Sequence, residues 1–269
     1  MKKLQCELCG SLEILKTADN LFQCQSCGCK YTLEQAKSLI QGIATTKQSD
    51  FIIQAGKLVK YCGESTNVVI PTNVSIIGKS AFNECSALNS VVIPNSVTTI
   101  EVGAFSGCRK LKSINIPESV TTIGRDAFSD CASITEISIP NGITAIDVGV
   151  FSRCGSLRKV NLPNRLEEIW GNAFFGCSNL QEIIIPLTVF KIGEYAFAGC
   201  TNLEKVSMSR NTYAPYSAFS STKWWKIQEE NKRKQTQMRK QQYLCLYCGG
   251  EFKGIFSLRC VKCGKKKNY

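Results

Sequence analysis

A 23-residue period that runs from Val68 to Phe219 constrains the fold of this chain more than any other feature. Prolines, phenylalanines and cysteines recur in phase, at Pro71, Pro94, Pro117, Pro140, Pro163 and Pro186, at Phe82, Phe105, Phe128, Phe151, Phe174 and Phe197, and at Cys85, Cys108, Cys131, Cys154, Cys177 and Cys200. A period of about 20–29 residues with alternating aliphatic positions is the signature of a solenoid. One coil cannot bury its apolar face alone, so we expect stacked coils to share one core.

Each unit predicts a strand, a return segment and a short covering element. Ile114 and Ile116 alternate with polar residues, which indicates a half-buried strand, and Pro117 ends it because proline has no N–H to donate. An irregular return segment follows, and the A-F-x-x-C step has the spacing of a short helix or turn on the convex side. The fold class is therefore an α/β-type repeat solenoid with a parallel sheet on the concave side and strands ~4.8 Å apart.

The recurring I-P step, A-F step and cysteine resemble the BspA-like leucine-rich repeats of bacteria and some protozoa. The resemblance covers about 150 residues. It implies protein–protein or surface interaction, and it implies no chemistry. Glu101, Asp147 and Trp170 stand where other units have glycine, and we expect them to bulge the loop without breaking the coil.

The cysteines of the repeats allow two interpretations. They could form a ladder of buried thiols, or neighbouring coils could bring them close enough for disulfides or a metal stack. A reducing compartment and the symmetry of the repeat favour buried thiols. Cys62, in the atypical first coil at Phe51 to Glu64, is expected to fill a small space in the core, since free cysteine is commonly buried.

The last coil departs from the period. Phe219 falls one residue short of the expected register, and Thr222-Lys223 stands where a cysteine is due. Trp224 and Trp225 follow, and we expect them to cap the open end of the core, with a partner anchor as the alternative.

Two pairs of C-x-x-C knuckles predict a structural zinc ribbon at each end of the chain. Zinc prefers four tetrahedral ligands, and each knuckle supplies two. The predicted ligands are Cys6, Cys9, Cys24 and Cys27 for one ion and Cys245, Cys248, Cys260 and Cys263 for the other. Cys29 could replace Cys27, although C-x-x-C-G makes Cys27 the symmetric partner. The first ribbon resembles an N-terminal ribbon of cytoplasmic proteins from low-GC Gram-positive bacteria, and the second resembles a ribbon that accompanies this repeat type.

Charge is concentrated at one end of the chain. The net charge is +12, and residues 223–269 hold thirteen basic and three acidic side chains, whereas residues 51–222 hold fourteen and thirteen. The run from Lys226 to Gln242 is expected to be a solvated helix or an extended linker. Its basic residues and those of the second ribbon could contact phosphates, namely Lys232, Arg233, Lys234, Arg239, Lys240, Lys265, Lys266 and Lys267.

Strand alternation places a row of small and mixed side chains on the concave face. These candidates for an interaction face are Ser90, Val92, Ser113, Asn115, Glu136, Ser138, Lys159, Asn161, Glu182, Ile184, Lys205 and Ser207. Because hot spots favour Trp, Tyr and Arg, this set predicts a weak or extended protein contact at best, and a merely solvated sheet is the alternative.

The domain plan follows from these patterns. Residues 1–31 form the first ribbon, 32–50 a short helix and linker, 51–222 the solenoid with terminal caps, 223–243 the basic helix or linker and 244–269 the second ribbon. No run of 18 apolar residues occurs, so we expect no membrane insertion. The N-terminus lacks an apolar run after its lysines, which argues against a secretory signal and favours a cytoplasmic location.

The sequence thus predicts a non-enzymatic scaffold or adaptor for protein–protein interaction, with two structural zinc ions. The chain has no histidine and no glycine-rich phosphate loop, so an enzyme is not expected. The alternative is a protein that binds nucleic acid weakly through its basic tail and second ribbon, and a surface adhesion protein is a third interpretation. The partner and the oligomeric state cannot be deduced from the sequence.

Overall fold

The computed structural model describes residues 50–242 and five short strands in the flanking regions. Those strands are β1 (Ile14–Lys16), β2 (Phe22–Cys24), β3 (Lys30–Tyr31), β19 (Phe252–Lys253) and β20 (Arg259–Cys260). The chain divides into two compact units, Met1–Lys223 and Trp224–Tyr269.

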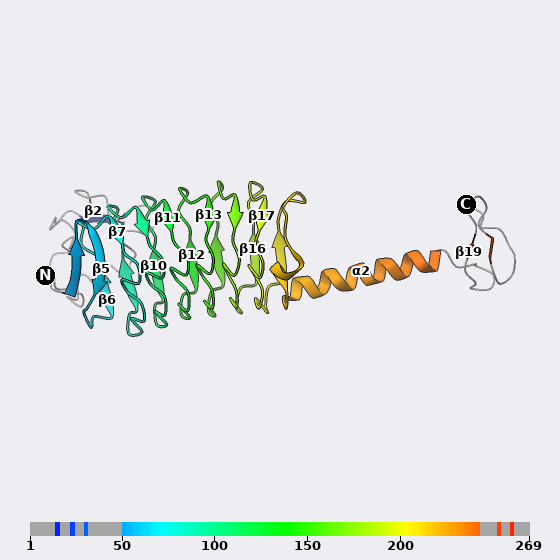
Figure 1. The fold of residues 1–269 in the computed structure, drawn as a ribbon, viewed down its shortest axis with the longest axis horizontal. Coiled ribbons are helices and arrows are strands. Elements are labelled where there is room, and N and C mark those ends of the chain that lie inside the picture. Colours follow the sequence, from blue (N-terminus) through cyan, green and yellow to red (C-terminus); the bar gives the residue numbers. More distant parts are fainter. Residues whose placement is uncertain are drawn as a thin grey trace. The chain divides into compact units, whose positions relative to one another are not determined.

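Seven three-residue strands, one in each coil, run in parallel along one side of the solenoid (Figure 1). They are β6 (Asn67–Val69), β8 (Ser90–Val92), β10 (Ser113–Asn115), β12 (Glu136–Ser138), β14 (Lys159–Asn161), β16 (Glu182–Ile184) and β18 (Lys205–Ser207). Paired residues are one full repeat apart, as Ile114 and Val91 are, so the sequence period is also the register of the sheet. We call the outward side of these strands the long-strand face.

A second parallel ladder replaces the irregular return segment that the sequence predicts. Its strands are β7 (Ile76–Ile77), β9 (Thr99–Ile100), β11 (Thr122–Ile123), β13 (Ala145–Ile146), β15 (Glu168–Ile169) and β17 (Lys191–Ile192). The second residue of each strand is a buried isoleucine, while the first lies outside the core. Two residues are too few to show alternation in a sequence, so the pattern alone does not reveal these strands. Each strand is instead defined by its backbone hydrogen bonds to the neighbouring coil. We call the outward side of these strands the short-strand face.

Turns, and no α-helix, complete the coils within residues 50–222, so the α/β-type expectation is corrected to a β solenoid. The A-F-x-x-C segment cannot continue as a right-handed helix because left-handed residues flank it. Each coil has two such positions with positive φ, at Ser80, Gly103, Asp126, Gly149, Asn172 and Tyr195 and, four residues later, at Glu84, Gly107, Asp130, Arg153, Gly176 and Gly199.

The expected bulges at Glu101, Asp147 and Trp170 are wrong for two of the three positions. The N–H of Glu101 donates to the Ile77 carbonyl at 2.9 Å, and Trp170 N–H donates to the preceding coil at the same distance. The N–H of Gly193 makes the equivalent bond at 2.7 Å. At Gly193 the two backbones approach especially closely. A Cβ on Gly193 would lie 2.8 Å from the Trp170 carbonyl carbon.

The core of the solenoid is a continuous stack of aromatic rings. From Phe82 to Phe219 the rings are stacked with centroids 4.8–5.5 Å apart. The rings of the in-phase phenylalanines are fully buried, and the aliphatic residues of both ladders pack beside them. Offset stacking of this kind is favourable beyond the area that it buries, so one residue type at one register can hold every coil to the next.

An antiparallel hairpin closes the N-terminal end of this stack. It consists of β4 (Phe51–Gln54) and β5 (Lys57–Tyr61), and β5 pairs in parallel with β7. Phe51 and Tyr61 extend the aromatic stack, because Tyr61 lies on Phe82 with centroids 5.1 Å apart. The atypical first coil is therefore a hairpin that covers the core and pairs with the second ladder.

The C-terminal end is closed by a coil that is one residue shorter. Lys205 pairs with Glu182, one full repeat earlier, but Tyr213 bridges to Lys191, which is one residue less than a full repeat earlier. The shortening therefore lies between β18 and Tyr213, and it brings Phe219, on the 3-10 helix η2 (Tyr216–Phe219), onto the stack at 5.1 Å. Thr222 then occupies the cysteine position, fully buried, and its hydroxyl donates to the Phe219 carbonyl at 2.7 Å.

Helix α2 (Lys223–Gln242) confirms the expectation of a solvated helix. Residues 230–237 are largely exposed, and Lys234 pairs with Glu230 one turn earlier at 2.7 Å. Trp224 and Trp225 lie in its first turn, half-buried, with their ring centroids 6.2 Å apart. Among the described residues no helix is long and apolar enough to cross a membrane.

Candidate interaction surface

The structure places all twelve predicted face residues on the outward side of β8 to β18. Each strand turns its central residue toward the core and its first and third residues away from it. Ten of the twelve are exposed, and Ser90 and Val92 are half-buried. The alternation that the sequence shows is therefore the alternation of the folded sheet.

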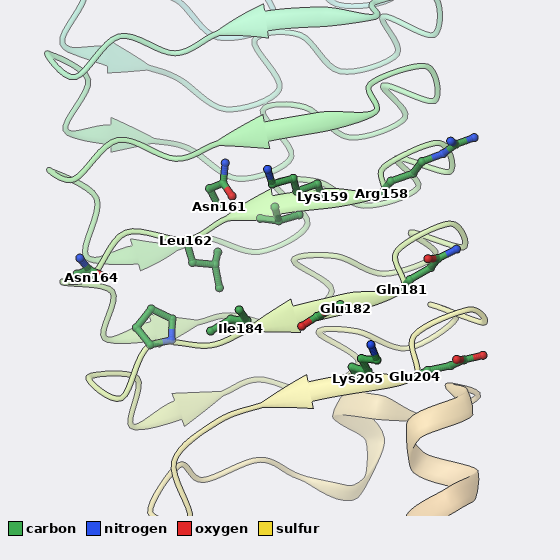
Figure 2. A pocket seen from close by; sticks show the side chains of 12 residues that line it. Arg158, Lys159, Asn161, Leu162, Asn164, Gln181, Glu182, Ile184, Glu204 and Lys205 are labelled. Atoms are coloured by element: carbon green, nitrogen blue, oxygen red, sulfur yellow. The ribbon is translucent and has the colours of Figure 1, made fainter. Parts of the chain in front are cut away.

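A groove of about 710 Å³ crosses the long-strand face at β14, β16 and β18 (Figure 2). We call it the long-strand groove. Its lining includes five of the twelve predicted residues, namely Lys159, Asn161, Glu182, Ile184 and Lys205. The other seven predicted residues do not line it, so the structure concentrates the candidate surface on the last three coils.

Alternating charges occupy one register position along this face. Glu136 pairs in the sheet with Lys159, and Glu182 pairs with Lys205. The strands are about 4.8 Å apart, so a row of opposite charges runs along the stack. Among the ion pairs of residues 50–237, none within 4 Å involves these four side chains. Their charged groups are therefore available to a partner, at the modest strength of exposed charges.

The second outward position supplies an apolar centre. Ile184 is 64 % exposed in the middle of the groove, whereas most large aliphatic side chains of the solenoid are buried. Figure 2 shows Leu162, from the neighbouring coil, between Ile184 and Asn161, and Pro186 also lines the groove. Single exposed aliphatic side chains are common on protein surfaces, so the weak protein contact and the solvated sheet both stay open as interpretations of this face.

The rim of the groove comes from residues that strand alternation could not identify. Arg158, Gln181 and Glu204 precede the three strands at one register, and Figure 2 shows them along one side of the groove. Leu162 and Asn164 lie on the other side. The repeat period itself could have found this rim, because residues next to a strand recur at the same spacing. Glu204 also forms an ion pair with Lys223 at 2.7 Å.

The in-phase cysteines are buried thiols in five of six coils. Cys108, Cys131, Cys154, Cys177 and Cys200 are fully buried and free, and each thiol donates to a phenylalanine carbonyl of the preceding coil at 3.1–3.2 Å. Burial raises the pKa of the Cys154 thiol to about 12 and raises the pKa of the Cys131 thiol in the same direction. A thiol that stays protonated is neither a nucleophile nor a metal ligand.

The two cysteines at the N-terminal end of the ladder differ from the rest. Cys85 is only half-buried, although burial still raises the pKa of its thiol. Cys62 is exposed, so its prediction as a core filler is wrong. The hairpin β4–β5 covers the aromatic stack with Tyr61, and the next residue therefore points away from the core.

The predicted zinc ligands lie largely outside the described residues. Cys24 ends β2, whose partner is β1, and Cys260 ends β20, whose partner is β19. In the pairing, Cys24 lies opposite Ile14 and Cys260 opposite Phe252. Both hairpins thus stop at the first cysteine of a second C-x-x-C knuckle. Within the described part of the chain, no group of three or more potential ligand side chains is suitable for a metal ion.

The predicted phosphate contacts also lie partly within and partly outside the described residues. Lys232, Arg233 and Lys234 are exposed on α2, and Arg239 and Lys240 belong to the same helix. Lys265, Lys266 and Lys267 are outside the described residues. The helix therefore carries a group of accessible cations, of which Lys234 is already paired with Glu230.

Comparison with known proteins identifies the repeats. Residues 56–180 and 122–240 match the model of the BspA type leucine-rich repeat region, which contains six copies of the repeat. No curated protein sequence matches this chain significantly. The family model names no enzymatic activity.

Solved structures of bacterial leucine-rich repeat proteins have the same fold. One from Bacteroides ovatus is 36% identical, with a TM-score of 0.58, over 62% of this chain and 45% of that chain. The leucine-rich repeat protein of T. pallidum is 28% identical, with a TM-score of 0.59, over 70% of this chain and 95% of that one. This chain thus spans less than half of the Bacteroides protein and nearly all of the T. pallidum protein.

The family match covers well over half of the chain and contains every stacked phenylalanine from Phe82 to Phe219. The in-register ladders and the structural similarity agree with it. The chain belongs to the BspA-type leucine-rich repeat family.

Proposed function

We propose that this protein is a non-enzymatic scaffold or adaptor that holds another protein in the long-strand groove. The observation that carries the proposal is the coincidence of an exposed Ile184, alternating charges and a hollowed surface on the same three strands. Leucine-rich repeat proteins generally mediate protein interactions, which supports the same interpretation.

The chemistry of the groove limits the partner. A segment that lies across β14, β16 and β18 would place an apolar side chain over Ile184 and alternate its own charges against Lys159, Glu182 and Lys205. The groove contains no aromatic side chain, and hot spots usually are Trp, Tyr or Arg, of which only Arg158 is present. We therefore expect a small contact of micromolar or weaker affinity, below the size of a standard stable interface.

Two exposed aliphatic residues, three positions apart, make a matched test. Ile184 lines the groove, whereas Leu187 is 83 % exposed outside it. Partners are captured from native lysate on wild-type protein, on Ile184→Ser and on Leu187→Ser, with nuclease treatment throughout. We expect Ile184→Ser to lose a partner that Leu187→Ser retains. If all three proteins capture the same set of partners, the proposal that a partner binds in the long-strand groove is refuted.

We also propose that each end of the chain carries one structural zinc ion. The hairpins β1–β2 and β19–β20 support this, because both end at a cysteine of a C-x-x-C knuckle and so present a thiolate at the tip of a strand. Four thiolates would suit zinc, whose binding would supply folding energy that so short a module lacks. Elemental analysis of reduced protein should give about two zinc ions per chain.

Single substitutions assign each ion. Cys6→Ser and Cys260→Ser should each remove one zinc and leave the thermal unfolding of the solenoid unchanged, because its core shares none of these ligands. Cys27→Ser and Cys29→Ser decide the open ligand, since only the true ligand lowers the zinc content. One zinc ion or none in wild-type protein would overturn the proposal.

A cytoplasmic location belongs to the same proposal. The seven described cysteines of the solenoid are all free thiols, as expected in a reducing compartment. Fractionation of the native cell with an antibody against the solenoid tests this, and recovery at the cell surface would favour the adhesion alternative instead.

Nucleic-acid binding by α2 is the second candidate, and the exposed cations of that helix favour it. Phosphate contacts release counterions, so such binding should be weak and should fall steeply with salt. Labelled duplex and single strand are titrated against wild-type protein, a Lys232→Gln/Arg233→Gln variant and, as the control, Lys159→Gln/Lys205→Gln. Loss of binding with the helix variant alone assigns it to α2, whereas tight, sequence-selective binding at about 200 mM salt would displace the scaffold proposal.

A further inference from the structure

One tryptophan on the short-strand face serves neither the core nor the long-strand groove. Trp170 follows β15 at a register where the other coils have Gly78, Glu101, Gly124, Asp147 and Gly193. Its indole is 43 % exposed, and its backbone makes the same hydrogen bond as the glycines do. The fold therefore does not require a large ring at this position.

A hollow of about 520 Å³ lies on one side of this indole. Apart from Trp170, its lining belongs to the two preceding coils, and we call it the Trp170 hollow. The lining residues are Thr121, Thr122, Ile123, Arg125, Ile143, Thr144, Ala145, Asp147, Val148 and Trp170. The volume is within the range of about 300–1,000 Å³ that small-molecule sites occupy.

The indole is held from its other side. The Nζ atom of Lys191, in the following coil, lies 5.1 Å from the centre of the Trp170 ring. The Glu168 carboxylate forms an ion pair with the same ammonium, with Oε1 3.9 Å from Nζ. A cation over an aromatic face is attracted to it by about 0.5–1 kcal/mol at an exposed site. One face of the ring is thus occupied from the C-terminal side, and the hollow lies toward the N-terminal side.

The polar groups of the hollow are balanced in charge. Arg125 is the one cation in its lining and Asp147 the one anion, so neither a phosphate nor an ammonium ligand would gain net attraction. Thr122 and Thr144 add hydroxyl groups that can both donate and accept, and the Thr121 hydroxyl, which donates to the Thr98 carbonyl at 3.5 Å, can still accept. The hollow thus offers a flat apolar wall next to a mixed set of donors and acceptors.

We propose that the Trp170 hollow is a carbohydrate site that binds one neutral sugar ring. The ring would place its C–H face on the indole and turn its hydroxyl groups toward Arg125, Asp147 and the threonines. A charged ligand would leave one of the two ionic groups opposed, whereas vicinal hydroxyls satisfy both a carboxylate acceptor and a guanidinium donor. This site is on the other ladder from the long-strand groove and is independent of the proposed scaffold function.

The fluorescence of Trp170 itself reports on the site. The chain has three tryptophans, so a Trp224→Phe/Trp225→Phe background leaves Trp170 as the only indole. This protein is titrated with cellobiose, maltose, lactose, mannobiose and di-N-acetylchitobiose. At least one should change the emission saturably with a Kd of about 1 mM, as one shallow ring site permits. Ligand-observed NMR with otherwise wild-type protein should detect the same disaccharide, and Trp170→Ala should abolish its signal.

Matched variants distinguish sugar binding in the Trp170 hollow from nonspecific binding elsewhere on the protein. Asp147→Asn and Arg125→Gln should each weaken binding at least tenfold, whereas Phe190→Ala, which removes an exposed aromatic outside the hollow, should leave it unchanged. Ile184→Ser should also leave sugar binding unchanged. The absence of sugar binding in the Trp170 hollow can therefore be distinguished from the absence of protein binding in the long-strand groove. The proposal is overturned if no disaccharide saturates below about 50 mM, well above the expected Kd, or if Trp170→Ala binds as the wild type does.

Discussion

The interior of the solenoid and its two outer faces share one sequence period but use it in opposite ways. Inside, the same residue recurs at each register, as the stacked rings and the buried thiols do. Outside, a register changes from coil to coil, as Asp147, Trp170 and Gly193 do in three consecutive coils. Invariance marks the positions at which every coil meets the same neighbours, and most of the variation lies on the outward side of the two ladders.

This difference separates stability from recognition. In a solenoid each coil touches only its neighbours, so the free energy of folding is close to a sum over coils and interfaces. A side chain on an outer face contributes little to that sum. Both candidate sites, the long-strand groove and the Trp170 hollow, include such variable positions, and they occupy different ladders.

The largest expected effect is alkaline unfolding, because the buried thiols act together. Burial raises the pKa of Cys154 from 9.0 to about 12, and it raises the pKa values of Cys108, Cys131 and Cys177 as well. The unfolded chain therefore releases protons that the folded chain retains, and stability falls as the pH rises above about 9. Each such thiol costs about 1.4 kcal/mol per pH unit, so several together would exhaust a stability of about 5–15 kcal/mol.

Urea denaturation at a series of pH values measures this effect. The midpoint should be constant up to about pH 8.5 and then fall steeply, since the ordinary thiol pKa is 9.0. Cys154→Val is the control, because it removes one titrating thiol and should make the fall less steep. A midpoint that stays level to pH 11 would contradict the buried, protonated state of these thiols.

The next effect concerns the aromatic stack. Phe151 is fully buried between Phe128 and Phe174, with centroids 5.5 and 5.4 Å away. Phe151→Ala should therefore lower the free energy of unfolding by about 3–5 kcal/mol. Phe190, in contrast, is 54 % exposed, and Phe190→Ala should change it by less than about 0.5 kcal/mol. Equal losses in chemical denaturation would remove the distinction between interior and face.

A smaller loss is expected from one thiol of the ladder. The Cys154 thiol donates to the Phe128 carbonyl at 3.2 Å, and that carbonyl also accepts the N–H of Cys131 at 3.3 Å. Cys154→Ala removes one of the two bonds and a buried sulfur, so we expect a loss of about 1–2 kcal/mol. Cys62→Ala is the matched control and should cost almost nothing, since Cys62 is exposed. A greater loss at Cys62 than at Cys154 would refute the ladder.

The sequence predicted part of what repeats, but it missed the second ladder, which recurs in six coils, and the one shortened coil. The period identified the coils and the stacking of equivalent strands, and the repeat symmetry favoured the buried thiols that the structure has at Cys131 and its equivalents, because each of these facts recurs along the solenoid. It did not show that the last coil would close by losing one residue before Tyr213, so Phe219 looked displaced although it is stacked. One shortened loop at one place leaves no periodic signal.

Local patterns also could not separate two kinds of glycine. Gly107 adopts a positive φ of 77°, which glycine takes without strain, whereas a Cβ on Gly124 would lie 2.8 Å from the Val102 nitrogen. Both recur with the same period, and only the fold distinguishes a left-handed turn from a close approach of backbones. For a related reason, the sequence could predict only some of the residues in the candidate sites. Alternation found Ile184, but the rim residues and Trp170 depend on which coils become neighbours.

The smallest predicted effect concerns an outer position that does stabilise the fold. Lys57 Nζ donates to Glu101 at 2.7 Å across an intervening coil, and the Lys79 N–H donates to the same carboxylate at 2.8 Å. The contact crosses Gly78, where a Cβ would lie 2.9 Å from the Lys57 side chain. The hydrogen bond from Lys57 is the main reason that the pKa of Glu101 is lowered. Its stabilisation is therefore present above the ordinary pKa of 4.5 and is lost as the pH falls through the lower value.

Because both side chains are partly exposed, Glu101→Gln should cost at most about 0.5 kcal/mol at pH 7 and less at pH 3. Glu136→Gln, on an exposed residue of the long-strand face, should cost nothing at either pH. Gly78→Ala should cost more than Glu101→Gln, because the added methyl group also meets the Leu58 carbonyl at 2.6 Å. A loss at Glu101 that persists undiminished at pH 3 would show that this position acts through packing, and the separation between a stabilising interior and freely variable faces would then fail at this coil.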